Sequence, residues 1–307
     1  MDILTSSIAQ GILWSIMAIG VYLTFRILDI ADMTAEGSFP LGAAITAHAI
    51  VTGVSPLLAT LMGTAGGALA GLVSGFLTTK LHIPDLLTGI LTMTGLYSVN
   101  LFIMGRANVP LTMDAAGKTL KNIFTTIAVG DSTTTTIVVG AIFLIVVIAL
   151  LVFFFNTEMG LAARAVGNNE DMSAANGIRA DNMKIVVYMI SNGLIALSGA
   201  LMAQTNGYAD ISMGIGTIVI ALAAIIIAEI LLKHLSFGMR LITIIGGAII
   251  YRLIIALVLE WGVDPNALRL FYAVMLTVFL ALPLIQKNIK QAQQRRRNTQ
   301  AMKKEAK

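Results

Sequence analysis

The chain of 307 residues lacks cysteine altogether and has only three histidines. Without cysteine, disulfides, iron–sulfur ligation and thiol nucleophiles are excluded. His48, His82 and His234 are not spaced as metal ligands, and neither H-E-x-x-H nor G-x-S-x-G occurs. Gly117-Lys118-Thr119 matches the end of a phosphate-binding loop, but Thr112 stands where that motif requires glycine. We therefore expect no catalytic residue, no cofactor, no nucleotide site and no metal.

Charge is also scarce. Charged residues make up 12% of the chain and hydrophobic residues 57%, against roughly 25% charged in an average soluble domain. The mean hydropathy is +0.88. A water-soluble domain of this size could not bury so much apolar surface, so soluble, disordered and fibrous proteins are excluded. Lipid must be the solvent for much of the chain.

The apolar runs predict an all-α, multi-pass bundle in the cell membrane. A helix that crosses the hydrocarbon core needs about 20 residues. About nine segments (eight to ten) fit, at residues 8–28, 39–51, 57–79, 86–104, 135–155, 185–203, 215–232, 241–259 and 268–284. The second is too short for an ordinary span and is typical of a broken helix, with Pro40 at its start, where proline costs least.

The third segment carries Gly63, Gly67, Gly71 and Gly75 at a four-residue spacing. Glycines at this spacing line one face of a helix and let a neighbouring backbone approach closely in lipid. We interpret this face as a packing surface rather than as a contact with a transported solute.

The distribution of cations predicts the orientation. With nine crossing segments, 15 of the 20 Lys and Arg residues fall on the side of the C-terminus and four on the other. By the positive-inside rule the N-terminus lies outside and the C-terminus inside. Residues 1–286 form the membrane domain, and residues 287–307, with eight cations and one Glu, form a basic cytoplasmic tail near lipid headgroups. The rest of the chain sums to −3, so no nucleic-acid partner is expected. We expect no cleavable signal peptide, because no cationic segment precedes the first apolar run.

Residues 156–184 form a long polar segment that the charge count places in the cytoplasm. Asn169 suits a helix N-cap, Glu170 and Asp171 place negative charge in the first turn, and Gly177 suits the C-terminal end. This predicts a helix of about two turns, with Ala174 and Ala175 leaving a smooth face. From its local chemistry, the segment could enter a groove on a partner or serve only as a solvated connector.

The segment resembles the cytoplasmic coupling segment of permeases of the branched-chain amino-acid type of ATP-binding-cassette (ABC) importers. The matching residues are Thr157, Gly160, Arg164, Ala165, Gly167, Asn168, Asn169, Ala174, Gly177 and Ile178. Residues 36–43, EGSFPLGA, resemble the broken second helix of that family. Residues 246–269 resemble a subgroup that is paired with binding proteins for hydrophobic or aromatic amino acids.

The resemblance implies a permease that pairs with a second permease copy, as a homodimer or with a sister chain. It also implies two cytoplasmic ATPase subunits, which hydrolyse ATP in place of this chain, and an extracytoplasmic solute-binding protein. The implied solute is an amino acid or a similar small amphiphilic molecule, moved by alternating access.

The resemblance also implies which residues meet the ATPase. They are Glu158, Gly160, Arg164, Gly167, Asn168, Asn169, Glu170, Asp171, Ala174, Ala175 and Gly177. On this hypothesis, replacing Gly167, Glu170 or Asp171 uncouples ATP hydrolysis from uptake and leaves the protein folded.

Polar groups in lipid are costly, so those within spans are candidates for the translocation path. They are Thr92, Thr94, Asn100, Asn192 and Arg252, joined by Phe39 at the start of the short second segment and by Ser38 just before it. The alternative for the hydroxyls and amides is a hydrogen bond to a neighbouring helix, and for Arg252 it is a pairing with Glu260. For the whole chain, the alternatives are a stand-alone secondary transporter and a membrane-embedded enzyme or structural subunit.

Overall fold

The computed structural model describes residues 2–112, 119–127, 130–232, 235–262, 267, 270–271, 273–278 and 281. Its elements are almost all helical, as predicted. They are α1 (Asp2–Tyr22), the π-helical turn η1 (Leu23–Ile27), α2 (Ala35–Val51), α3 (Pro56–Lys80), α4 (Asp85–Met104), β1 (Asn108–Pro110), α5 (Ile123–Thr126), α6 (Ser132–Phe155), α7 (Glu158–Asn168), α8 (Glu170–Ala175), α9 (Ala180–Asn206), β2 (Tyr208–Asp210), the 3-10 turn η2 (Ile211–Gly214), α10 (Thr217–Leu231) and α11 (Phe237–Glu260).

Seven helices in the described part of the chain are long and apolar enough to cross a membrane. They are Ile3–Ile27, Pro56–Lys80, Asp85–Met104, Ser132–Phe155, Ala180–Asn206, Ile211–Leu231 and Phe237–Glu260, and each matches a predicted segment. The predicted segment 39–51 corresponds to α2, which has only 17 residues and is not among these seven helices. The ninth predicted segment, 268–284, is described only in part, at residues 270–271, 273–278 and 281, so the total of nine stays a prediction.

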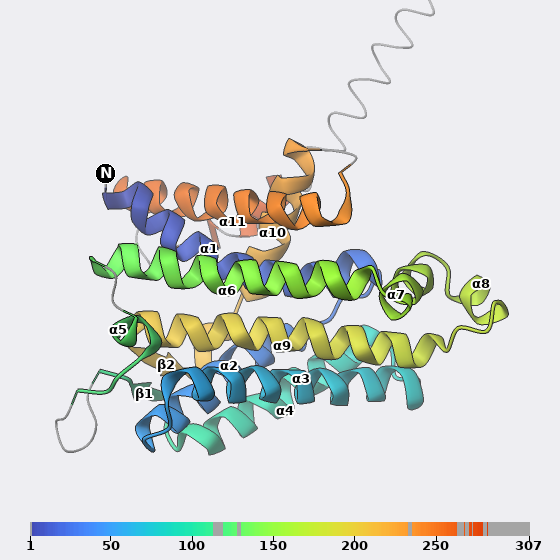
Figure 1. Cartoon of the computed structure of the whole chain (residues 1–307), viewed down its shortest axis with the longest axis horizontal. Coiled ribbons are helices and arrows are strands. Elements are labelled where there is room, and N and C mark those ends of the chain that lie inside the picture. The colour runs from blue at the N-terminus through green and yellow to red at the C-terminus, as the bar shows by residue number, and fades with distance from the viewer. Residues whose placement is uncertain are drawn as a thin grey trace, which may run out of the picture.

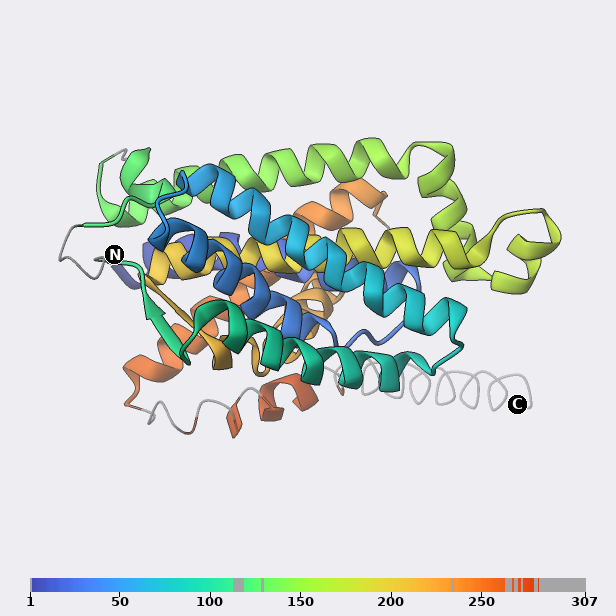
Figure 2. The same ribbon diagram turned by 90° about the horizontal axis from the view of Figure 1, so that it is seen from below.

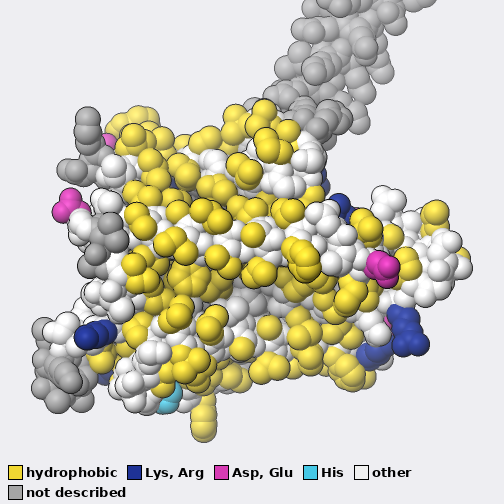
Figure 3. Space-filling view, in the orientation of Figure 1, with side chains coloured by type: hydrophobic (Ala, Val, Ile, Leu, Met, Phe, Trp, Pro, Cys, Tyr) yellow, Lys and Arg dark blue, Asp and Glu magenta, His cyan; other side chains and the backbone are white. Residues whose placement is uncertain are grey.

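The long helices stack side by side (Figure 1). Helices α11 and α1 lie on one side, α6 and α9 in the middle, and α2, α3 and α4 on the other, where Figure 2 shows them in front. Helices α7 and α8 project at one end, while α5, β1 and β2 lie at the opposite end. Hydrophobic side chains cover the length of the bundle, and the charged ones gather at its two ends (Figure 3). This distribution fits a bundle that lipid surrounds.

Helix α2 begins at Ala35, so the predicted start at residue 39 and the placing of Pro40 at that start were wrong. Pro40 lies inside the helix and cannot donate to the carbonyl of Glu36. Gly214 of η2 packs at this point, where a Cβ would lie 2.0 Å from the Glu36 oxygen. The helix starts earlier because the Thr34 carbonyl accepts from the amides of Gly37 and Ser38 (2.9 Å each), while the Thr34 amide donates to the Asp32 carboxylate (2.9 Å).

Helix α9 is the centre of the packing on the side of α2 and α3. A Cβ on Gly67 would lie 2.5 Å from the carbonyl oxygen of Asn192, and one on Gly71 would lie 2.2 Å from that of Tyr188. Helix α2 approaches α9 as closely, since a Cβ on Gly42 would lie 2.0 Å from the carbonyl oxygen of Ala196. The glycine face of α3 is therefore a packing surface, as predicted.

A small strand pair that the sequence did not predict closes the end of the bundle opposite α7 and α8. β1 and β2 pair antiparallel, with Val109 opposite Ala209. Asp210 accepts hydrogen bonds from Asn108 (3.0 Å) and from the backbone amide of Ser212 (2.8 Å). Partial burial raises the pKa of Asp210, but the hydrogen bonds from Ser212 and Asn108 outweigh it and hold that pKa below its ordinary value. The carboxylate thus stays charged at neutral pH and ties β1 to η2.

Candidate functional site: the α7–α8 projection and the polar cluster beneath it

Two helices make the α7–α8 projection, and each begins with a side-chain cap. The Thr157 hydroxyl accepts from the Gly160 amide (3.4 Å) at the start of α7. Asn169 ends α7 and also caps α8, where its Oδ1 accepts from the Met172 amide (2.9 Å). Because the extended backbone of Asn169 separates the two helices, the chain turns between them.

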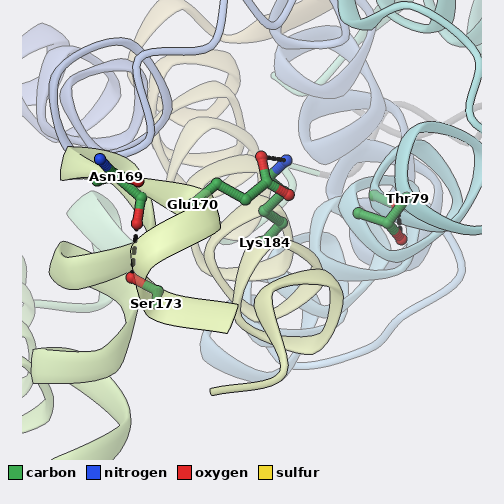
Figure 4. Close-up of polar contacts among 6 residues, drawn as sticks. Thr79, Asn169, Glu170, Ser173 and Lys184 are labelled. Carbon is green, nitrogen blue, oxygen red and sulfur yellow. Dashed lines mark hydrogen bonds and ion pairs between the residues drawn. The ribbon is translucent and has the colours of Figure 1, made fainter. Parts of the chain in front are cut away.

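Helix α8 confirms the predicted short helix, with its cap at Asn169 and Glu170 and Asp171 in its first turn. It runs six residues to Ala175, and Gly177 follows with a φ of +82°, which favours glycine. In Figure 4 Glu170 and Lys184 point toward each other, and their ion pair (2.7 Å) holds α8 against the start of α9. The Ser173 hydroxyl donates to the carbonyl of Asn169 (2.8 Å), which fixes the helix internally.

One side of α8 is free in the single chain. Met172 is 65% exposed, and Asp171, Ala174 and Ala175 are exposed beside it, whereas Ser173 is buried. Asn168, Asn169 and Glu158 are also exposed. The exposed methionine and the two alanines give a small apolar surface beside the Asp171 carboxylate, of the kind that partner proteins cover.

Three of the predicted coupling residues lie in α7 and pack against the bundle. A Cβ on Gly167 would lie 1.7 Å from the Ile27 carbonyl oxygen, and one on Gly160 would lie 2.3 Å from that of Phe154. The Arg164 guanidinium lies over the rings of Phe155 (5.2 Å) and Phe237 (4.4 Å). These residues fasten α7 to the bundle, so we expect replacement of Gly167 to cost stability as well as coupling.

Ion pairs join helix ends near this projection. Arg26 of η1 pairs with Glu229 of α10, and Lys80 of α3 pairs with Asp181 of α9 (2.7 Å). Their side chains are 27–42% exposed, so each contributes at most about 1 kcal/mol. Their effect is to set the positions of the helix ends rather than to stabilise the whole fold.

A buried polar cluster lies deeper in the bundle and joins α2, α3, α4 and α9. Asn192 accepts from the Ser38 hydroxyl (2.7 Å) and donates to the Asp32 carboxylate (2.8 Å). The Thr34 hydroxyl contacts those of Ser74 (2.6 Å) and Thr92 (2.7 Å), and all of these side chains are at most 9% exposed. The structure thus brings three of the predicted path residues, Ser38, Thr92 and Asn192, into one network of interhelical hydrogen bonds.

The other predicted path residues lie apart from this cluster. Phe39 is buried and stacks on Trp14 (5.4 Å between centroids), and the Arg252 guanidinium lies over the same Trp14 ring (5.7 Å). Thr94 is exposed on α4 and donates to the carbonyl of Ile90 (2.8 Å). Asn100 is buried on α4 and donates to the carbonyl of Gly37 (3.2 Å).

Asp32, Thr34 and Ser74 belong to this cluster but were not among the residues predicted from the sequence. A signal was present for the first two, because an Asp two residues before a Thr at a helix start suits an Asx turn. The structure shows that turn, with the Thr34 amide donating to the Asp32 Oδ1 (2.9 Å). Ser74 carried no comparable signal, since a serine among the glycines of α3 reads as part of the packing face. Among the described residues, no cluster of His, Asp and Glu could hold a metal ion.

The long apolar helices, the polar cluster buried between them and the projecting short helices define a multi-pass membrane protein with a free surface at one end. Comparison with known proteins then gives the family. The model of the family described as "Branched-chain amino acid transport system / permease component" matches residues 3–282. The chain belongs to this family of permeases.

Two relatives cover nearly the whole chain. The "Tyrosine transport system permease protein" of Clostridioides difficile (strain R20291) is 40% identical over 90% of this chain and 90% of its own length. An uncharacterized protein of Rickettsia prowazekii (strain Madrid E), RP368, is 31% identical over 92% of this chain and 98% of its own. No solved structure matches the chain. The chain is therefore a transport subunit of the cell membrane, of the ABC importer permease type that its motifs resemble.

Proposed function

We propose that this chain forms the solute path of an ABC importer and couples, through α7 and α8, to a separate ATPase. The observation that carries the proposal is the free surface of α8 around Met172, Ala174 and Ala175. The cap at Asn169 and the Glu170–Lys184 ion pair hold this helix in a defined position on α9. A rigid, capped helix transmits a push better than a flexible connector, and α7 links it to η1 and α11 through Gly167 and Arg164.

The proposed orientation places α7 and α8 in the cytoplasm, with the N-terminus outside and the C-terminus inside. The positive-inside rule supports it, as do the positions of Lys80, Arg164, Arg179 and Lys184 in and beside this projection. Residues 287–307 then form the basic cytoplasmic tail, and residues 1–286 form the membrane domain with residues 156–184 as its coupling segment. We also propose that residues 268–284 form a ninth span.

The proposed partners are two ATPase subunits at α8, a solute-binding protein at the opposite end and a second permease copy. Membership in the permease family supports these partners, because a permease component is one part of a transport system. The proposed solute is an amino acid with a hydrophobic or aromatic side chain. The relative from Clostridioides difficile, which is named a tyrosine transport system permease protein, supports this class.

A stand-alone secondary transporter is the alternative, and the energy source separates the two. Uptake should stop when the ATPase subunit is removed and should continue when a protonophore collapses the ion gradient. Uptake that survives without any ATPase but fails with the ion gradient would contradict the proposal.

The sharper experiment places a charge on α8 in the complete transporter. Because Met172 is exposed in the single chain, Met172→Asp should leave the fold intact and weaken ATPase binding by about tenfold or more, as charge in an apolar contact does. Co-purification of the ATPase with tagged permease measures this, and ATP-driven uptake should fall in parallel. Ile127→Asp, a charge on an exposed apolar residue at the opposite end, is the control for co-purification. Wild-type ATPase recovery and uptake in Met172→Asp would contradict coupling through α8.

A further inference from the structure

A cavity of about 440 Å³ lies between α2, α4 and η2, apart from the buried polar cluster. This volume falls in the range of small-molecule sites. Its lining includes Glu36 of α2, Met93, Tyr97, Ser98 and Asn100 of α4, and Ile215 just after η2. We call it the α2–α4 cavity.

Asn100, one of the residues around this cavity, carries an unused acceptor. Its side chain is fully buried, and its Nδ2 donates to the carbonyl of Gly37 (3.2 Å). Since a carbonyl can only accept, this bond fixes the amide with Nδ2 toward Gly37. The Oδ1 has no hydrogen-bond partner among the described residues. A buried acceptor without a partner is costly, which points to a donor that the protein itself does not supply.

Glu36 supplies a negative charge to the same cavity. Its carboxylate is half-buried and accepts one hydrogen bond, from the backbone amide of Gly216 (3.1 Å). No Lys or Arg in the described ranges forms an ion pair with it. A carboxylate and a carbonyl oxygen that both lack a cationic donor match a primary ammonium group, which offers three N–H donors and one positive charge.

The remaining lining is apolar or aromatic, with two hydroxyl groups. Met93, Ile211 and Ile215 provide aliphatic and thioether surface, and Tyr97 provides a ring that is 54% exposed. Thr94 and Ser98 lie four residues apart and are exposed on the same face of α4. Polar residues on an outward face of a membrane helix are poorly suited to lipid and indicate a watered path or a protein contact.

We infer that the α2–α4 cavity recognises the ammonium group of the transported solute. The Glu36 carboxylate and the Asn100 Oδ1 accept from the ammonium, while Met93, Tyr97 and Ile215 contact an apolar or aromatic body. The ligand class is thus a primary amine with an apolar side chain. This inference rests on the proposed function, because it assigns a contact along the proposed solute path.

The natural absence of cysteine makes a direct test of access possible. Ser98→Cys and its neighbour Val99→Cys, which lines the apolar groove on the other side of α4, are each introduced into the complete permease–ATPase complex in nanodiscs. A positively charged, water-soluble methanethiosulfonate reagent should modify the Ser98→Cys variant faster than the Val99→Cys variant, by about tenfold or more given the cost of moving a charge into lipid. Equal rates would overturn the inference that the cavity is a watered site.

Protection by ligands tests the recognition itself. Millimolar tyramine or L-tyrosine, each with an ammonium group, should slow modification of the Ser98→Cys variant, whereas 3-(4-hydroxyphenyl)propionate, which has only a carboxylate, should not. Glu36→Gln, introduced into the Ser98→Cys variant, keeps an acceptor for the Gly216 amide. It should weaken protection by about tenfold, as loss of a charge-assisted contact does. Asn100→Leu should act in the same direction. Asp131→Asn, which removes an exposed carboxylate at the start of α6, should leave protection unchanged.

Equal protection by the propionate, or full protection in Glu36→Gln, would overturn the inference. The outcome is separable from that of the proposed function. A wild-type complex that shows ATP-driven uptake but no ammonium-dependent protection contradicts only the inference. A complex without ATP-driven uptake contradicts the proposed function.

Discussion

Asn192 shows how one amide can hold a membrane bundle together. It is fully buried and connects Ser38 of α2 to Asp32 in the segment before α2, and it donates a further bond to the carbonyl of Tyr188 (3.1 Å). In lipid no water can replace these partners. The side chain therefore ties the start of the short helix α2 to α9.

Replacing Asn192 with Leu should destabilise the protein by about 2–3 kcal/mol, because the buried Asp32 loses a donor. The thermal unfolding temperature in detergent should fall accordingly. Asp32→Asn provides the comparison, since the new amide oxygen still accepts from the Thr34 amide, and the Asn192 amide can flip so that its oxygen accepts from the new NH2. We expect a smaller loss for Asp32→Asn than for Asn192→Leu. Equal stability of Asn192→Leu and wild type would contradict the role of this cluster.

At the residue scale, the sequence predicted several residues of the site but not the contacts that join them. Asn169, Glu170 and Gly177 were found because caps act within one or two turns of the chain. Thr92 and Asn192 were predicted because polar residues stand out in apolar runs, and Ser38 because it lies at the start of the short second segment. The sequence did not predict that Thr34 connects these residues, because a contact between residues 34 and 92 depends on how the helices pack.

At the element scale, α7 connects the free helix α8 to the rest of the bundle. Gly167 lies against the carbonyl of Ile27 at the end of η1, and Arg164 lies over Phe237 at the start of α11. A movement of α8 would therefore reach α1 and α11 through α7. The Arg164 contact is of the cation–π type and is worth about 1–2 kcal/mol where water is partly excluded.

Gly167→Ala should displace α7, because the new methyl group would meet the Ile27 oxygen at 1.7 Å. We expect a loss of about 1–3 kcal/mol in stability and a fall in ATP-driven uptake. Gly246→Ala is the matched control, since a Cβ there meets nothing within 4 Å and alanine favours the helix. A Gly167→Ala protein with wild-type stability and uptake would show that the close contact has no mechanical role.

At the scale of the whole molecule, the two ends of the bundle differ in what they expose. One end carries α7 and α8 with their exposed helix face, and the other carries α5 and the β1–β2 pair (Figure 1). A transport system that receives a solute on one side and energy on the other needs such a difference. The proposed orientation assigns α7 and α8 to the cytoplasm.

Single cysteines in this cysteine-free chain test that orientation. The substitution Ser132→Cys lies at the start of α6 and Asn176→Cys follows α8, and both positions are exposed. In intact cells a membrane-impermeant maleimide should label the Ser132→Cys variant, whereas the Asn176→Cys variant should react only after the membrane is permeabilised. The reverse pattern would place α8 outside the cell and contradict its contact with an ATPase.

The sequence by itself determined the class of protein, the seven long helices and the short helix α8. Hydropathy and capping act over neighbouring residues, so they can be read along the chain. Only the tertiary structure decided that α2 begins at Ala35, that Gly160 and Gly167 are packing contacts, and that Glu36 and Asn100 line one cavity with η2. These features depend on which helices meet and at what distance, and residues far apart in the chain set that distance.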